Sequence, residues 1–407
     1  MIKNIVFYYP SRRIGGAQLL FYRCAEWLSS LKRYNVSYID YVDGFVRGQL
    51  DKTNIAFIDQ ADIIIPEYAI IVLPLSRIMT YNRIFGGRIN DTTRFLFWSI
   101  HPHNITDAFT IKNRFLLPPC IRNSAGRTID TLSEMGVIRY MDYQNYDSVY
   151  SAFHLKEKSG IAYLPIPFGD EEQFVASPVH RQNNCDVISF LWLSRLMGEK
   201  TQMVTDLFVE LEHLDLGKDI VLHIVGDGED EELIKQESLK YGFKTIMHGR
   251  MYGLDLDTLI DSVDIGVAVG TSALEIAKRC KPVIVGAPSL YYEDGGHVKE
   301  KRNKEYIVLS QQTDYSVGGP QFYTPGQRTF NDLCHDILHD YEKYSKDCCD
   351  YVLYNHSMSK VGEALLSGFD KLSLLAQKDM IHQLEKLRLK MVIPMKIIGM
   401  LKRVMSF

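Results

Sequence analysis

Residues 264–285 read DIGVAVGTSALEIAKRCKPVIV, and this stretch decides the fold class. The apolar, β-branched run up to Val269 predicts a short buried strand, and Gly270 permits a tight turn after it. Ser272 with Glu275 three residues later matches a capping box, which predicts that a helix begins there. The dipole of that helix favours positive charge at its C-terminal end, where the sequence has Lys278, Arg279 and Lys281. The stretch therefore predicts strand, turn, helix and strand, the repeating unit of an α/β protein.

The turn at Gly270 also has a chemical consequence. It would point free backbone N–H groups and the positive end of a helix past the edge of the sheet, which suits a phosphate group. The alternative is that every capped helix in an α/β protein has this pattern without binding anything. The stretch alone does not separate the two interpretations, and the preceding part of the chain favours a phosphate.

The composition is that of an ordinary globular protein. The chain has 407 residues, 46% of them hydrophobic and 24% charged, which predicts two domains. Its net charge of −4 implies no general affinity for nucleic acid. Seven cysteines without a CxxC pair indicate a reducing compartment. Because the sequence contains neither a signal-peptide pattern nor an apolar run of about 18 residues, we expect a cytoplasmic protein.

The first half of the chain alternates between strand and helix patterns. Residues 2–9 form an apolar run that leads through Gly15-Gly16 into an amphipathic helix, which is how a Rossmann-like unit opens. The glycine pair lacks the GxGxxG spacing, so no dinucleotide is indicated, and the alternative is that it merely turns the chain. Further strands are expected at 36–42, 63–65, 70–73, 95–99 and 138–141, with helices at 18–31, 75–85 and 129–135.

The strand expected at 95–99 leads into His101-Pro102-His103. Polar residues just past the C-terminal end of a parallel strand lie where open α/β sheets bind ligands. A lone histidine is more often structural than functional, and two in one such loop leave both interpretations open.

A stretch with prolines and Gly169 then interrupts the alternation, and we expect a linker at 169–185. Beyond it the pattern predicts strands at 187–193, 219–225 and 244–247 and helices at 200–213, 230–241 and 254–262. Four features follow the predicted strands in order: Leu193-Ser194-Arg195 with Lys200, Gly226-Asp227-Gly228, His248-Gly249-Arg250, and Gly270 to Glu275. Because the C-terminal ends of parallel strands share one edge of a sheet, these features should converge along one crevice.

In this order and spacing the four features resemble the GT-B glycosyltransferases, in particular the large retaining family that includes bacterial polysaccharide and lipopolysaccharide sugar transferases (glycosyltransferase group 1, family 4-like). The match covers about residues 187–285, and the Gly15-Gly16 loop and Pro165-Ile166-Pro167 also look like that family's. The resemblance implies two Rossmann-like parallel-sheet domains that face each other across a cleft, with C-terminal helices. We expect an N-terminal acceptor domain at 1–168, a nucleotide-sugar domain at 186–365, and C-terminal helices with a basic tail at 366–407.

The resemblance also implies a role for each matching residue. Arg195 and Lys200 would hold the diphosphate of a UDP- or GDP-linked sugar and stabilise the leaving group in place of a metal. The alternative is that they form surface ion pairs, for example with Glu199. His101 would lie near the donor sugar. The other donor-binding residues would be Gly15 and Gly16 towards the diphosphate, Gly226, His248, Gly249 and Arg250 along the nucleobase side, Gly270, Thr271 and Ser272 at the phosphates, and Glu275 at the ribose, where it competes with plain capping. No cofactor and no metal is expected.

One position departs from the family's pattern. A second glutamate usually lies eight residues before the one matching Glu275, and Val267 stands there instead. The identity of the donor sugar therefore stays open. No general base is evident either, and in a retaining enzyme the leaving phosphate would deprotonate the acceptor. Asp255-Leu256-Asp257 falls at a helix start, so we interpret it as compensation of the helix dipole rather than as a metal-binding motif.

The C-terminal tail is both basic and apolar. Helices are expected at 330–344, at 360–376 and from 380 onward, and Pro394 should kink or split the last of them. Residues 386–407 contain no acidic residue and six basic ones, namely Lys386, Arg388, Lys390, Lys396, Lys402 and Arg403. Such a segment is too short to span a membrane and predicts an interfacial anchor on anionic lipid. The alternative is a terminal helix packed across both domains.

The sequence thus predicts a glycosyltransferase with a nucleotide-sugar donor and a glycan or lipid-linked acceptor, acting in bacterial cell-surface polysaccharide synthesis. It would be peripheral on the inner face of the cell membrane, and no nucleic-acid partner is expected. Two alternatives stay open. One is a non-catalytic GT-B subunit that binds a partner transferase, and the other is a sugar-nucleotide epimerase or hydrolase on the same fold.

Overall fold

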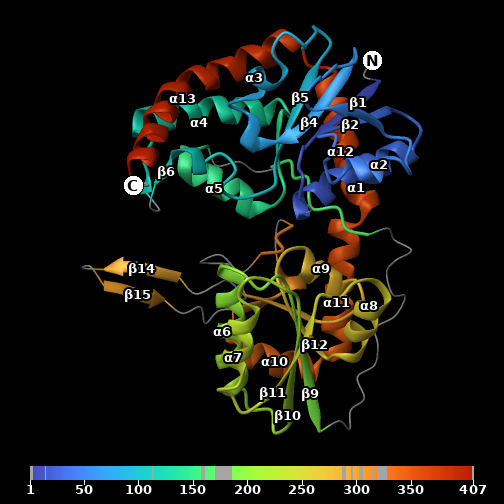
Figure 1. Ribbon diagram of the computed structural model, residues 1–407, viewed down its shortest axis with the longest axis vertical. Coiled ribbons are helices and arrows are strands. Elements are labelled where there is room, and N and C mark those ends of the chain that lie inside the picture. The colour runs from blue at the N-terminus through green and yellow to red at the C-terminus, as the bar shows by residue number, and fades with distance from the viewer. Residues whose placement is uncertain are drawn as a thin grey trace. The chain divides into compact units, whose positions relative to one another are not determined.

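A computed structural model of the protein divides into two compact units (Figure 1). Unit 1 comprises Met1–Pro167 and Met358–Phe407, and unit 2 comprises Phe168–Ser357. The expected boundary at residue 365 falls inside a helix of unit 1, so the chain returns to unit 1 earlier, at Met358. Apart from Gly169, the expected linker lies outside the described residues. The structure describes residues 3–13, 15–111, 114–156, 161–169, 186–286, 290–294, 297–301, 306–312, 315–318 and 328–405.

Unit 1 is built on a parallel six-stranded sheet in the order β3-β2-β1-β4-β5-β8. Its central strands are buried because helices cover both faces, as the continuous apolar runs predict. The strands are β1 (Asn4–Tyr8), β2 (Asn35–Asp40), β3 (Ala56–Asp59), β4 (Ala69–Pro74), β5 (Arg94–Ser99) and β8 (Ile138–Tyr140). A short pair, β6 (Thr110–Ile111) and β7 (Arg114–Phe115), stands apart from the sheet.

Two sequence expectations for unit 1 are wrong. No strand forms at 63–65, because β3 already pairs with β2 and occupies that edge of the sheet. The helix expected at 75–85 is split into η1 (Leu75–Arg77) and α3 (Tyr81–Phe85). The split arises because the backbone between them makes tight i to i+3 hydrogen bonds, including one from Thr80 N–H to Arg77 C=O of 2.9 Å.

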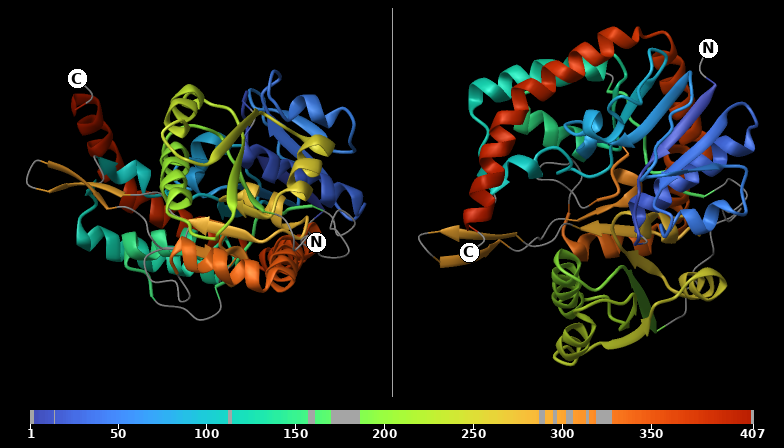
Figure 2. Two further views of the ribbon diagram at one scale, coloured as in Figure 1. Left: turned by 90° about the horizontal axis from the view of Figure 1, so that it is seen from below. Right: turned by 45° about the horizontal axis from the view of Figure 1, so that its top comes forward.

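The remaining helices of unit 1 come from both ends of its sequence. The last of them, α13, runs along α4 and continues through Pro394, so the helix is not split, although Figure 2 shows that it bends partway along its length. The helix α12 packs on α1, where a Cβ added to Gly362 would lie 2.2 Å from the Trp27 ring. These elements are α1 (Gly16–Ser30), α2 (Arg47–Leu50), η2 (Asp107–Phe109), α4 (Pro119–Glu134), α5 (Tyr143–Phe153), α12 (Met358–Ser373) and α13 (Gln377–Met405).

Unit 2 repeats the architecture with a six-stranded sheet in the order β11-β10-β9-β12-β13-β16, parallel except for β16. Its strands are β9 (Val187–Leu193), β10 (Asp219–Val225), β11 (Lys244–Gly249), β12 (Ile265–Val267), β13 (Val283–Gly286) and β16 (Tyr306–Val308), and a separate hairpin pairs β14 (Leu290–Asp294) with β15 (His297–Lys301). Its helices are α6 (Glu199–Glu212), α7 (Glu231–Ser238), α8 (Gly253–Ser262), α9 (Thr271–Ala277), η4 (Leu309–Gln311), α10 (Phe330–His339) and α11 (Tyr341–His356). The single helix expected at 330–344 is therefore two helices, which meet at Asp340.

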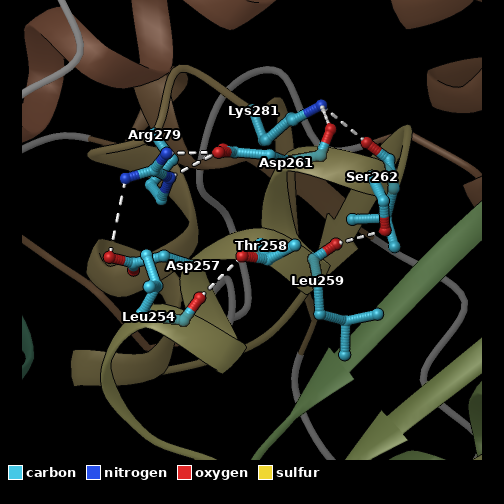
Figure 3. Close-up of polar contacts among 9 residues, drawn as sticks. Leu254, Asp257, Thr258, Leu259, Asp261, Ser262, Arg279 and Lys281 are labelled. Carbon is cyan, nitrogen blue, oxygen red and sulfur yellow. Dashed lines mark hydrogen bonds and ion pairs between the residues drawn. The ribbon is translucent and has the colours of Figure 1, made fainter.

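The cations after α9 hold unit 2 together differently from the sequence expectation (Figure 3). Lys281 donates to the carbonyls of Asp261 and Val263, both at 2.8 Å, so it satisfies the C-terminal end of α8 rather than that of α9. Arg279 binds the carboxylate of Asp261 through two nitrogens and reaches Asp257 at 3.6 Å. Lys281 is buried, and this burial lowers its pKa. Asp255 lies in the first turn of α8, where a carboxylate opposes the helix dipole as predicted.

Candidate functional site

The four predicted features of unit 2 lie at one edge of its sheet. They follow β9, β10, β11 and β12, which are neighbours in the sheet, and each begins at the C-terminal end of its strand. Main-chain hydrogen bonds join three of the loops: Ser194 N–H donates to Val225 C=O at 3.1 Å, and Gly226 N–H donates to Gly249 C=O at 2.8 Å. The predicted convergence along this edge is therefore observed within unit 2.

The Gly226-Asp227-Gly228 turn packs directly against the loop that carries Arg195. A Cβ on Gly226 would lie 1.8 Å from the carbonyl oxygen of Ser194, and one on Gly228 would lie 2.1 Å from that of Leu196. Gly226 also has a φ of 146°, which L side chains rarely adopt. Both glycines are thus required by close backbone approach within the protein, whether or not a ligand also lies against them.

Asp230 holds the beginning of α6, and the sequence analysis did not single it out. Its carboxylate accepts hydrogen bonds from Gly198 N–H at 3.2 Å and from the Thr201 hydroxyl at 2.7 Å. Its own N–H donates to Leu196 C=O at 3.1 Å. The signal that could have revealed it is an acidic residue just after the Gly-Asp-Gly turn, within reach of the preceding helix start.

Arg195 and Lys200 lie at the centre of this edge. Arg195 is exposed and Lys200 is half-buried, and neither forms a hydrogen bond or ion pair with any residue that the structure describes. The pKa of Lys200 is lowered, first by burial and then by the positive charge of Arg195, while Glu199 opposes the shift. Two like charges held close together without a counter-ion favour an anionic ligand between them. The expected alternative, a surface ion pair with Glu199, is not formed.

The turn after β12 differs in detail from its prediction. The helix α9 begins at Thr271, and Gly270 is its N-cap, with a φ of 67° and no side-chain capping bond. The predicted capping box from Ser272 to Glu275 is therefore wrong, because Ser272 lies inside the helix. Glu275 instead forms an ion pair of 2.5 Å with Lys278, one turn further along. Thr271 is exposed and Ser272 half-buried at the free end of this helix.

The end of β11 forms a histidine pair with β10, and the loop after β11 forms an ion pair. Arg250 binds Asp227 at 2.6 Å on the surface, which links this loop to the Gly-Asp-Gly turn. His248 lies next to His223 of β10, with Nε2 and Nδ1 2.9 Å apart and the rings nearly parallel at 12°. The pKa of each is lowered, that of His248 by burial and that of His223 by burial and then by His248 and Lys244. The hydrogen bond requires one of the two facing nitrogens to be unprotonated.

We expect this pair to make unit 2 less stable in mild acid. Because the folded pKa values lie below the ordinary value near 6.5, the unfolded chain takes up protons first as the pH falls, and stability is lost from about pH 6.5 downward. Denaturant unfolding at pH 7 and at pH 5 should show that His223→Gln loses less unfolding free energy between the two pH values than the wild type does. The difference should be less than about 1 kcal/mol, because both rings are partly solvated. The exposed His335→Gln variant is the control and should behave as the wild type. Equal losses in all three proteins would contradict the assignment.

The candidate residues of unit 1 lie at the corresponding edge of its own sheet. Gly15 is the N-cap of α1 and Gly16 its first residue, and neither has a positive φ. A Cβ on Gly16 would meet nothing within 4 Å, so the fold of unit 1 does not itself require that glycine. His101 is exposed after β5, and its Nδ1 accepts from His103 N–H at 3.2 Å. A joint role of these residues with those of unit 2 stays a prediction.

Val267 is buried in β12, where the resembling family has a glutamate. It lines a small internal cavity with Trp192, Met203 and Leu207, beneath α6. Its side chain is thus part of the core of unit 2. Among the described residues, no group of three or more His, Cys, Asp or Glu side chains could hold a metal ion.

Comparison with known proteins relates the chain to others through its fold. No protein-family model and no curated protein sequence matches it. In structure, a glycosyltransferase from Rickettsia africae is 14% identical, with a TM-score of 0.61 over 91% of this chain and 98% of that one. HepE from Anabaena, solved with UDP and glucose, is 11% identical with a TM-score of 0.55 over 91% and 100%. WaaB, a lipopolysaccharide outer core galactosyltransferase, is 13% identical with a TM-score of 0.54 over 91% and 100%. The chain therefore has the two-domain α/β GT-B fold.

Proposed function

We propose that the protein is a glycosyltransferase that takes a UDP- or GDP-linked sugar as its donor. The observation that carries the proposal is the pair Arg195 and Lys200, two cations at the C-terminal edge of the unit 2 sheet that form no ion pair with the described part of the chain. Glycosyl transfer develops negative charge on the departing diphosphate, and preorganised positive charge stabilises it most effectively in a partly desolvated site. The free end of α9 at Gly270, Thr271 and Ser272 would add N–H donors to the same phosphates.

The reaction would proceed without a metal and with retention of configuration. The bond between the anomeric carbon and the phosphate oxygen breaks, the acceptor oxygen forms the new bond on the same face, and the acceptor proton passes to the leaving phosphate. Arg195 and Lys200 would neutralise that phosphate as it departs. Glu275 pairs with Lys278 through Oε1, so Oε2 would be the oxygen that accepts from the ribose hydroxyls. His101 of unit 1 would lie near the donor sugar, and Gly15-Gly16 near the diphosphate.

The acceptor we propose is a glycan or a lipid-linked saccharide in bacterial cell-surface polysaccharide synthesis. HepE is solved with UDP-glucose, and WaaB is named for the lipopolysaccharide outer core, so structural neighbours include proteins of this chemistry. No helix among the described residues is long and apolar enough to cross a membrane. We propose a cytoplasmic enzyme whose residues 386–407 bring it to the inner membrane face, where such an acceptor would be presented.

Nucleotide binding tests the donor site directly. Calorimetry without metal should detect UDP or GDP binding to the wild type, and Arg195→Ala should weaken it by about tenfold or more, the loss expected for one charge-assisted contact. Lys240→Ala is the matched control, because Lys240 is an exposed cation of unit 2 paired with Glu237, outside the site. It should bind as the wild type does. Binding that survives in Arg195→Ala would place the nucleotide elsewhere.

The alternative is a non-catalytic subunit of the same fold that binds a partner transferase. Val267 favours it, because a buried valine cannot contact a donor sugar as the usual glutamate would. The free cations Arg195 and Lys200 argue against it, because a protein without a donor has little need of both. If the wild type binds no common nucleotide in the calorimetric experiment, the subunit becomes the better proposal. Product analysis would distinguish an epimerase or hydrolase from a transferase, because either enzyme would form an isomer or free sugar from the donor without any acceptor.

A further inference from the structure

The last helix of unit 1, α13, is apolar on two opposite sides. One side is buried within unit 1, where α13 runs beside α4 (Figure 1), and consists of Met380, Leu384, Leu387, Met391 and Ile398. Hydrogen bonds fix the helix there, because Lys390 donates to Ser124 C=O at 2.6 Å and Lys402 to Asp107 C=O at 2.6 Å. The helix is therefore docked on its own unit before any partner arrives.

The other side of α13 carries what we name the outer stripe. It consists of Leu389, Ile393, Ile397, Met400 and Leu401, with exposed fractions of 62%, 65%, 54%, 65% and 44%. At 3.6 residues per turn these five side chains fall within an arc of about 120°, opposite the buried set. A surface helix normally turns polar residues outward, so a second apolar face is a surface that lacks its partner.

The surroundings of the outer stripe are positively charged. Lys386 and Lys396 are exposed and form no ion pair with any residue that the structure describes. Arg127 of α4 is exposed too, and with Lys386 it adds to burial in lowering the pKa of Lys390. Of the acidic groups on the packed elements, Glu385 is paired with Arg388, and Asp107 of η2 is exposed. From Lys386 to Lys402, α13 carries five basic residues and no acidic one, so the charge along the stripe itself is positive.

We propose that the outer stripe is a docking surface for a membrane that contains anionic lipid, with α13 lying in the plane of the interface. Apolar side chains would enter the boundary between headgroups and acyl chains while Lys386 and Lys396 meet lipid phosphates. A second copy of the chain would bring the same positive charge against itself, which disfavours a dimer through this face. This membrane surface depends on the proposed glycosyltransferase function in one respect only: that function would give it a purpose, namely access to a lipid-linked acceptor.

Vesicle binding of the full chain tests the surface. The wild type should co-sediment with vesicles of phosphatidylcholine and phosphatidylglycerol, and much less with phosphatidylcholine alone. Ile393→Gln with Ile397→Gln should lower the partition coefficient by about tenfold or more, because both side chains leave the interface. Lys386→Gln with Lys396→Gln should lower it less and flatten its dependence on salt. Leu233→Gln with Leu239→Gln, exposed apolar residues on α7 and just after it, is the control and should bind as the wild type does.

Two outcomes would overturn the proposal. One is vesicle binding that the Ile393→Gln, Ile397→Gln variant leaves unchanged. The other is absence of vesicle binding by the wild type; a wild-type dimer that this variant dissociates in analytical ultracentrifugation would then assign the stripe to a second copy. UDP and GDP binding measured on the same proteins separates the two proposals. The stripe variants should keep nucleotide binding, so a failed donor site and a failed membrane surface give different results.

Discussion

Lys200→Ala is expected to lower the rate of sugar transfer by about 100- to 1000-fold, the loss typical of removing one group that stabilises transition-state charge. Lys200 lies in the first turn of α6, which Asp230 fixes through Gly198 and Thr201, so the backbone that carries its side chain is held in place before the donor binds. Its half-burial makes each interaction with a phosphate stronger than it would be in water. The measurement is single-turnover transfer from the donor that calorimetry identifies, compared at saturating donor.

Two variants separate catalysis from structure at this position. Lys200→Arg keeps the charge and should retain part of the activity, whereas Glu199→Gln removes only a neighbouring exposed carboxylate and should change the rate by less than about threefold, as expected for surface electrostatics. Burial and Arg195 lower the pKa of Lys200, so activity should fall as the pH rises through this lowered pKa. That alkaline decline should disappear in Lys200→Arg, since a guanidinium stays charged. An unchanged rate in Lys200→Ala would refute the assigned role.

The sequence identified this site because its residues follow strands in a fixed order. Loops at the C-terminal ends of parallel strands meet at one edge whatever their details, so the sequence alone groups Arg195, Gly226, Gly249 and Gly270. The sequence did not reveal which groups bind one another. Glu275 forms an ion pair with Lys278 instead of the predicted capping bond. Which of the two forms depends on side-chain geometry, which residue spacing does not determine.

Hydrophobic periodicity predicted much of the fold, as it did the position of the candidate site. Most strands of both sheets and most helices of unit 2 were predicted within two or three residues, because short β-α repeats leave few other arrangements, whereas β3 was missed. The tail was predicted less well. Its many apolar residues predicted that α13 has more than one apolar side. They did not predict that one side packs on α4, because that contact joins residues far apart in the chain. Asp40 was missed for another reason: its partners Tyr41, Val46 and Arg47 are close in the chain, but they bind it through backbone N–H groups, which no side-chain motif marks.

Asp40 organises the edge of unit 1 from a fully buried position. Its Oδ1 accepts from Ser11 N–H at 2.8 Å and Tyr41 N–H at 2.9 Å, and its Oδ2 accepts from Val46 N–H at 3.0 Å and Arg47 N–H at 3.2 Å. The carboxylate therefore ties the loop after β1, which leads towards Gly15, to the loop after β2. A Cβ on Gly44 would lie 2.3 Å from this carboxylate, so that loop closes tightly around it.

Asp40→Ala is expected to destabilise unit 1 by about 3–5 kcal/mol, because four N–H groups lose a charged acceptor and the buried ones cannot reach water. Asp40→Asn keeps one oxygen but turns an NH₂ group towards two donors, so it should lose roughly half as much. Asp43→Ala is the matched control in the same loop: Asp43 is exposed and paired with Arg12 at 2.7 Å, and its removal should leave the stability of unit 1 close to that of the wild type. Urea unfolding followed by a probe in unit 1 measures all three. Equal losses for Asp40→Ala and Asp43→Ala would mean that the four hydrogen bonds do not hold this edge, and the Gly15-Gly16 loop would then need another anchor.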